Sequence, residues 1–353
     1  MSENKDKILL ILTGGTICSF PDENGEKSPH TEKAERLIRT IFKNSGSKYS
    51  QVEFDDKVPL NILSENITLD SWNKLVSAIR GYNIDDYRGV IILHGTDTLA
   101  YTSSMLSLLL AGSSVPVFLV SSQLPLTEDG ANGNDNFKVA VHLIMEGIKP
   151  NVYVPYRNMD GKMYVHLGAH LCQCPVLSND FKSMDPYYIE DVDNPQMAGI
   201  PFESNEDIIK KIGMFTPSVL MISPYVGLDY SRVKMSGIKA VVHGTYHSQT
   251  LCVEKTRRND NISCYSVLKL KKCFKKTGKK VPLFLQPSNY VLSGNVSCYE
   301  TTAEVVRQGA VAVWGMTEEM VYVKTIVGVA LGYRASALEN FVCNKRINHE
   351  FHY

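Results

Sequence analysis

The stretch ILLILTGGTICSF, residues 8–20, decides the fold expected of this chain. Its apolar run, residues 8–12, leads into Thr13 and stops at Gly14 and Gly15, and Thr16 follows. An apolar run without alternation is typical of a parallel strand that helices cover on both faces. Ligands of such sheets bind beyond the carboxyl ends of the strands. The stretch therefore predicts a buried first strand. The turn after it is either a ligand-binding turn, because glycine lets a ligand approach the backbone closely, or a tight turn whose hydroxyls cap the next segment.

The composition favours a globular protein with two domains, since 353 residues exceed one typical core. Lys and Arg together number 37, and so do Asp and Glu, so the net charge does not indicate binding to nucleic acid or to a membrane. The charged start MSENKDK and the lack of any apolar run near ~20 residues argue against a signal peptide and a membrane span. We therefore expect a cytoplasmic protein whose eight cysteines are free thiols.

Short apolar runs alternate with helix-like segments along most of the chain. In the first half we expect strands at 8–12, 89–93, 115–120 and 151–155, and helices at 30–44, 69–82, 101–111 and 134–146. In the second half we expect strands at 218–223, 240–242, 282–285 and 310–313, and helices at 250–259, 267–277, 301–308 and 317–330. Such alternation indicates βαβ units and parallel sheets. The sequence thus predicts an α/β fold in two parallel-sheet domains.

The periodicity fades between residues 191 and 212, where the chain carries Pro195, Gly199 and Pro201 among many acidic residues. Such a stretch is typical of an interdomain linker. We therefore expect a larger N-terminal α/β domain at residues 1–190, a linker at 191–212, and a smaller C-terminal α/β domain at 213–353.

A second stretch, GVIILHGTDTLAYTSS at residues 89–104, repeats the pattern of the first. A buried strand again precedes a polar turn, HGTDT, and a helix follows. The acidic and hydroxyl side chains of this turn are also suited simply to cap that helix. A hydroxyl nucleophile, however, needs an activating base, and a carboxylate suits an amino group of a substrate. If the two turns meet at one sheet edge, they supply these parts through Thr13, Thr16, Thr96 and Asp97.

The two turns together resemble the bacterial-type L-asparaginase family, most closely its cytoplasmic type I branch. The resemblance rests on TGGTI at 13–17 and ILHGTDTLAYT at 92–102. Further matches are Pro59, Leu60, Ser64, Thr68, Trp72, the stretch SQLPL at 122–126, Asp129, Gly130 and Asn136. The resemblance implies an amidohydrolase that converts asparagine to aspartate and ammonia through an acyl-threonine ester. It also implies no metal or organic cofactor, and a homotetramer built as a dimer of dimers.

The resemblance assigns roles to individual residues. The nucleophile is Thr16, and Thr96 and Asp97 assist it together with a lysine further along the chain. Ser64 and nearby backbone hold the substrate carboxylate, and Asp97 holds its amino group. The candidate substrate-binding residues are Gly15, Ser64, Glu65, Gly95, Thr96, Asp97 and Gln123.

This chain departs from the family at two positions. Glu26 stands where the family carries a tyrosine on a mobile loop, and His166 stands where it carries the lysine. Histidine is a suitable base near neutral pH, so we predict His166 as the fourth catalytic residue, with Lys162 as the alternative. The departures also leave open a second class of function, a ligand-binding or regulatory homologue with weakened chemistry.

Three other groups of residues favour no further function. His166, His170, Cys172 and Cys174 are possible zinc ligands, but their spacing does not match a structural zinc site. The histidines of HGTYHSQT at 243–250 are interpreted as loop residues, or as part of a ligand site between domains. The basic run at 269–280 is interpreted as a solvated helix face.

Overall fold

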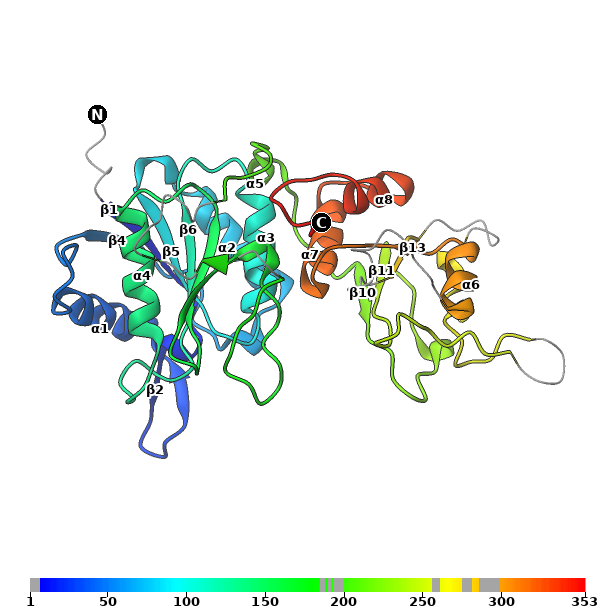
Figure 1. The fold of residues 1–353 in the computed structure, drawn as a ribbon, viewed down its shortest axis with the longest axis horizontal. Coiled ribbons are helices and arrows are strands. Elements are labelled where there is room, and N and C mark those ends of the chain that lie inside the picture. Colours follow the sequence, from blue (N-terminus) through cyan, green and yellow to red (C-terminus); the bar gives the residue numbers. More distant parts are fainter. Residues whose placement is uncertain are drawn as a thin grey trace. The chain divides into compact units, whose positions relative to one another are not determined.

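The computed structural model describes residues 7–184, 188–189, 192, 200–255, 261–274, 281–285 and 299–352. The chain forms two compact units (Figure 1). Unit 1 comprises Met1–Ile212 and Ile347–His349, and unit 2 comprises Gly213–Arg346 and Glu350–Tyr353. The domain boundaries predicted from the sequence, 1–190, 191–212 and 213–353, remain a prediction. None of the helices in the described part has the length and apolar character that a membrane crossing requires.

Unit 1 is built on a seven-stranded sheet in the order β4-β1-β5-β6-β7-β8-β9. The strands are β1 Lys7–Leu12, β4 Glu53–Lys57, β5 Gly89–Leu93, β6 Val117–Val120, β7 Val152–Arg157, β8 Met163–Leu167 and β9 Tyr188–Ile189. The first five strands of that order are parallel, and β8 and β9 are antiparallel to their neighbours. From β1 the chain adds β4 on one side and β5 on the other. The strand order therefore reverses at β1 and β5, which is where open α/β sheets bind ligands.

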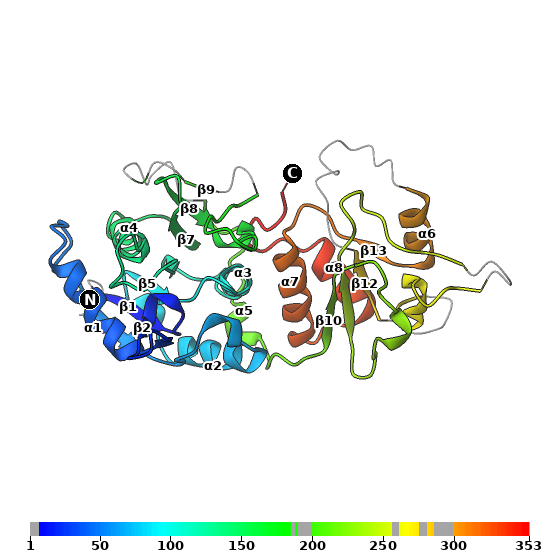
Figure 2. The ribbon, with the colours of Figure 1, turned by 90° about the horizontal axis from the view of Figure 1, so that it is seen from below.

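Helices cover both faces of this sheet. They are α1 Thr31–Lys43, α2 Leu69–Arg80, α3 Leu99–Leu109, α4 Gly133–Met145 and α5 Ile208–Lys211. Helices α1 and α4 contact each other on one side, while α2 and α3 lie on the other side and contact α5 (Figures 1 and 2). All five residues of β5 are buried, as are residues 8–12 of β1. The uninterrupted apolar runs of the sequence are thus explained by cover on both faces.

Unit 2 contains a smaller, wholly parallel sheet. Its strands are β10 Val219–Ile222, β11 Ala240–His243, β12 Leu283–Leu285 and β13 Val311–Ala312, in that order. Its helices are α6 Glu300–Gln308, α7 Glu318–Ala330 and α8 Ala335–Cys343, and α7 packs on α8, β10 and β11. The buried Lys324 on α7 pairs with the buried Glu350 near the chain end. The predicted α/β fold with parallel sheets is confirmed.

Two predicted helices are wrong, and some strands were not predicted. Residues 250–255 of the predicted helix at 250–259 are not helical, and residues 256–260 lie outside the described part. In the described residues of the predicted helix at 267–277, the chain forms the 3-10 turns Val267–Lys269 and Lys271–Cys273 instead, and the Ser266 hydroxyl accepts the N–H of Leu268. The end of the basic run, residues 275–280, also lies outside the described part. Strands β4 and β8 were missed, since charged edge strands and antiparallel additions lack a continuous apolar run.

The turns after β1 and β5 touch through glycine backbone. Gly15 adopts φ of 78°, and a Cβ atom placed on it would lie 2.2 Å from Gly95 Cα. Gly14, with φ of 113°, is equally close to the backbone of Ile62, where its added Cβ would lie 2.1 Å from the carbonyl oxygen. No side chain fits at either position without displacing backbone. The two glycines of the opening stretch thus let the two turns meet.

We predict that Gly15→Ala lowers the free energy of unfolding by at least about 3 kcal/mol, because backbone of two strands must move apart. Gly25 is a matched control, since its φ is 81° and it has open space around it. Gly25→Ala should therefore cost only about 1 kcal/mol, the penalty of left-handed backbone. Urea denaturation of both variants measures the two costs. Equal losses would show that the contact between Gly15 and Gly95 does not constrain the fold.

Candidate active site

Thr16 begins a 3-10 turn, Thr16–Cys18, directly after the glycine contact. Ile17 and Cys18 are buried, whereas the Thr16 side chain is half-buried. The turn is fixed through the Gly15 carbonyl, which accepts the Cys18 N–H (3.0 Å) and the Ser19 hydroxyl (2.9 Å). The anchored turn leaves Thr16 with access to solvent, as a nucleophile requires.

Thr13 is part of the framework instead. Its side chain is buried, and its hydroxyl donates to the Leu93 carbonyl (2.9 Å). The Thr13 backbone N–H donates to the same oxygen (3.1 Å). Thr13 thus holds the ends of β1 and β5 together, and its hydroxyl is engaged with backbone.

His94 supports the second turn from inside the protein. It is completely buried, and this burial lowers its pKa to about 4, so its ring is neutral near pH 7. The Nδ1 atom lies 2.7 Å from the Gly95 carbonyl oxygen. Because a carbonyl only accepts, Nδ1 carries the hydrogen and donates it. His94 therefore orients the peptide that leads into Thr96.

Asp97 is positioned by reciprocal hydrogen bonds with Ser64. The Ser64 hydroxyl donates to Asp97 Oδ2 (3.0 Å) and accepts the Asp97 backbone N–H (3.1 Å). The Thr98 hydroxyl donates to the Ser64 carbonyl (3.0 Å), so the two segments are tied at three points. Asp97 is exposed and Thr96 is half-buried. The carboxylate is therefore fixed by one oxygen while it faces solvent.

Sequence reasoning missed three residues beside this turn. Gln173 donates its side-chain N–H to the Asp97 carbonyl (2.6 Å). Tyr156 and Phe181 line a cavity of about 350 Å³ together with Thr96 and Asp97. All three lie 59 or more positions beyond Asp97 along the chain, so no local motif points to them.

Two buried asparagines hold the turn after β6. Asn132 Oδ1 accepts the backbone N–H of Gln123 (3.0 Å). The Asn136 amide donates to the Ser121 carbonyl (2.9 Å) and accepts the Arg157 N–H (2.8 Å), so it links the ends of β6 and β7. Gln123 itself donates to the Gly130 carbonyl (3.3 Å) and is half-buried. Its role in substrate binding stays a prediction.

His166 and Glu26 stand where the resemblance expects a lysine and a tyrosine, and the two residues lie in different surroundings. His166, on β8, is buried with its Nδ1 atom 2.8 Å from the Ser183 hydroxyl, and burial lowers its pKa to about 3. Glu26 is exposed at the hairpin between β2 Ser19–Pro21 and β3 Lys27–Pro29. Lys162 and Glu65 are also exposed. The structure therefore gives His166 Nδ1 a hydroxyl partner, and the catalytic role of His166 stays a prediction.

The histidines and cysteines of residues 166–174 are engaged in other contacts. His170 Nε2 contacts the His349 carbonyl, and Cys174 Sγ donates to the carbonyls of Ser178 and Asp180. Among the described residues, no group of three or more His, Cys, Asp or Glu side chains is placed to hold a metal ion.

Residues 7–176, which carry both turns, match the family Asparaginase, N-terminal. This segment of the chain is therefore similar to the N-terminal domain of asparaginases. The chain is 34% identical over 150 residues to the L-asparaginase of Thermococcus kodakarensis. The matched residues make up 42% of this chain and 44% of that protein. A subunit of the glutamyl-tRNA(Gln) amidotransferase of Methanococcus maripaludis is 29% identical over 249 residues, 67% of this chain and 58% of that protein. The chain thus spans about half the length of the relatives it matches.

The fold of a solved L-asparaginase matches both units. The solved L-asparaginase of Thermococcus kodakarensis matches with a TM-score of 0.72 at 23% identity, covering 98% of this chain and 99% of that one. At this identity the match shows the fold alone. The chemistry of this chain must therefore be argued from its own residues.

Proposed function

We propose that this chain is an amidohydrolase that hydrolyses the side-chain amide of asparagine to aspartate and ammonia. The observation that carries the proposal is the backbone contact between Gly15 and Gly95, since it brings the Thr16 and Thr96 turns to one sheet edge. The carboxylate of Asp97, held by Ser64, adds an acceptor for the substrate amino group. A nucleophile, a second hydroxyl and an anion at the strand reversal are the parts that amide hydrolysis needs.

The reaction proceeds in two steps. In the first, the Thr16 oxygen attacks the amide carbon and its proton passes to a base. The carbon–nitrogen bond then breaks as the amide nitrogen takes up that proton and leaves as ammonia. In the second, water attacks the resulting ester, aspartate leaves, and the Thr16 hydroxyl is restored. As proposed, the scheme uses a protein hydroxyl, a protein base and water, and it involves no cofactor.

The alternative is a ligand-binding homologue that uses the same turns without turnover. The exposed position of Glu26 and the hydroxyl partner of His166 favour this alternative, since the family places a tyrosine and a lysine at these positions. Ammonia release from asparagine, glutamine and β-aspartyl amides separates the two functions. Binding without ammonia release would establish the alternative.

We predict that Thr16→Val or Thr96→Val lowers the rate of ammonia release by at least ~100-fold, because each removes a hydroxyl but keeps the shape of the side chain. Thr40→Val, on the exposed face of α1, is the control and should leave the rate unchanged. The Tm of each variant verifies folding. A wild-type rate in both active-site variants would show that the hydroxyls of these turns take no part in the reaction.

His166 is predicted to act as the base that accepts the Thr16 proton. Its pKa of about 3 keeps the imidazole neutral above pH 5, so its titration should leave the rate constant between pH 5 and 8 and lower it only toward pH 3. His166→Ala should lose at least ~100-fold in rate, and Lys162→Ala should stay within about 2-fold of wild type. The pH–rate profiles of the three proteins test this. Full activity in His166→Ala with loss in Lys162→Ala would make Lys162 the base.

We also propose that the protein is a cytoplasmic homotetramer, a dimer of dimers in which a partner's C-terminal domain completes each site. The exposure of Asp97 in a single chain supports this, because hydrolysis is more effective when a site excludes bulk water. Sedimentation velocity at micromolar concentration should show a species of four chains. A monomer under these conditions would contradict the proposal.

A further inference from the structure

Asp97 is fixed by two different segments of unit 1. The Ser64 hydroxyl bonds its carboxylate (3.0 Å) and its backbone N–H (3.1 Å). The side-chain amide of Gln173 donates to its backbone carbonyl (2.6 Å). Ser64 lies 33 positions before Asp97 in the sequence, and Gln173 lies 76 positions after it. The N–H and the carbonyl of Asp97 are therefore held by side chains from distant parts of the chain.

Helix α3 begins without a side-chain cap, which makes the bond from Gln173 more important. Thr98 occupies the N-cap position, but its hydroxyl donates to the Ser64 carbonyl (3.0 Å) and caps no N–H of the helix. A side-chain cap normally helps to fix the first turn of a helix. Here Gln173 fixes the peptide between Asp97 and Thr98 instead, since the oxygen of that peptide is the Asp97 carbonyl. Because the peptides on either side of a Cα atom orient its side chain, this bond also orients the Asp97 carboxylate.

The segment that carries Gln173 is itself packed on α3. It begins with the 3-10 turn η4 Gly168–His170, whose residues are buried and contact α3. The Ser103 hydroxyl of α3 donates to the Gly168 carbonyl (3.1 Å). The segment thus contacts α3 within the helix, at Ser103, and the chain just before the helix, at Asp97. Gln173 is therefore presented by a support that is bound to the same helix as its hydrogen-bond partner.

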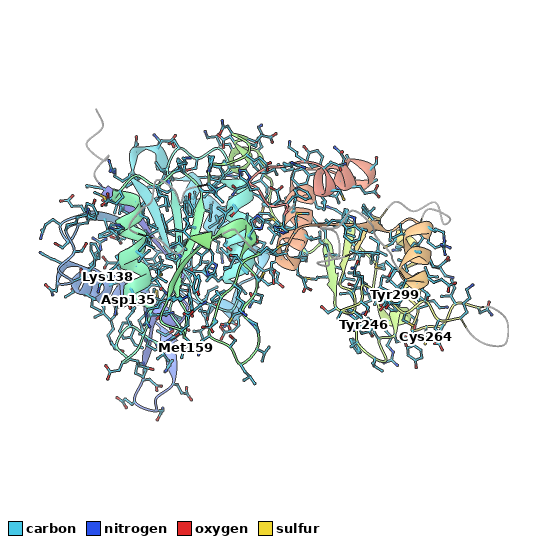
Figure 3. The ribbon with its side chains drawn as sticks, viewed as in Figure 1. Asp135, Lys138, Met159, Tyr246, Cys264 and Tyr299 are labelled. Carbon is cyan, nitrogen blue, oxygen red and sulfur yellow. The ribbon has the colours of Figure 1, made fainter. Side chains whose placement is uncertain are left out.

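The loop that follows Gln173 is anchored at its far end. Asn158, in the turn between β7 and β8, exchanges two hydrogen bonds with the Phe181 backbone (2.9 and 3.0 Å). The next residue, Met159, which is labelled in Figure 3, donates its N–H to Asp180 (2.7 Å). The chain is thus fixed on both sides of Gln173 by contacts within unit 1. A donor with such support is suited to hold its partner in one orientation.

We infer that Gln173 is a positioning residue for the recognition of the substrate amino group. Through the Asp97 carbonyl it orients the Asp97 carboxylate, which holds that amino group. The inference rests on the proposed function, in which Asp97 binds the α-nitrogen of asparagine. Because the bond is made to the Asp97 backbone, it orients the carboxylate without occupying the carboxylate oxygens.

A substrate without an amino group separates this role from a general effect on the site. Succinamate is asparagine without its α-amino group, and it keeps the side-chain amide and the carboxylate. An effect on the chemical step that both substrates share cancels in the ratio of their kcat/KM values. The ratio therefore reports the interaction between the amino group and the Asp97 carboxylate.

The test uses Gln173→Met, which keeps the length of the side chain and removes its N–H donor. We expect kcat/KM for asparagine, divided by kcat/KM for succinamate, to fall by about 3- to 10-fold, the scale of one hydrogen bond. Gln173→Ala should give a fall of the same size. Calorimetry with L-aspartate and succinate, the two products, should show the same change in the ratio of Kd values. If succinamate is hydrolysed too slowly to measure, the Kd ratio decides.

Gln51→Met is the matched control. Gln51 is exposed in the turn that precedes β4, so the same substitution there should leave both ratios unchanged. The Tm of each variant verifies folding.

The outcomes separate the inference from the proposed function. An unchanged ratio in Gln173→Met, which includes losses of equal size for asparagine and succinamate, overturns the inference. The proposed function then still stands if Thr16→Val abolishes the hydrolysis of asparagine. If the wild-type protein releases no ammonia from asparagine, both are overturned.

Discussion

The contact between Gly15 and Gly95 is the constraint on which the site depends. Parallel pairing sets Leu12 opposite Leu93, so the chains leave β1 and β5 at the same height and their first turns must share the same space. Only backbone without Cβ atoms fits there, and Gly95 would itself collide with Ser64 Oγ if it carried one (2.4 Å). The packing that excludes side chains is thus also what brings two threonine turns and Ser64 together.

Two buried polar groups under these turns, the Thr13 hydroxyl and His94 Nδ1, donate to backbone carbonyls and are therefore not available to a ligand. The His94 ring is kept neutral by burial and donates to backbone, and the Thr13 hydroxyl does the same. An unsatisfied polar group at this depth would cost stability, so these bonds are required by burial alone. The side chains of these turns that keep contact with solvent include Thr16, Thr96 and Asp97. A ligand at this edge of the sheet therefore meets the solvent-accessible side chains of the turns, while the buried polar groups beneath them are held by backbone.

The elements that could be predicted from the sequence are those in which a local pattern of residues has a single physical cause. Continuous apolar runs marked β1 and β5, and the turn residues that follow them do meet. Sequence reasoning failed where the cause is tertiary, since the charged edge strand β4 is fixed by pairing with β1. The predicted helix at 267–277 also failed, and two short 3-10 turns stand in its described part. Gln173, Tyr156 and Phe181 reach the site from distant segments. Thr13 was grouped with the reactive threonines, because a sequence does not distinguish a hydroxyl that faces backbone from one that faces solvent.

The replacement of lysine by histidine sets a limit on the chemistry. Burial disfavours the charged form of His166 and lowers its pKa to about 3, which makes the neutral base available near pH 7. The same burial weakens that base, since each unit by which its pKa falls costs about 1.4 kcal/mol when it takes up a proton. A proton from Thr16 therefore moves to His166 only if an anion nearby stabilises the imidazolium as it forms. Asp97 is the carboxylate of the site, so the distance between Asp97 and His166 in the substrate-bound protein decides whether histidine substitutes for lysine.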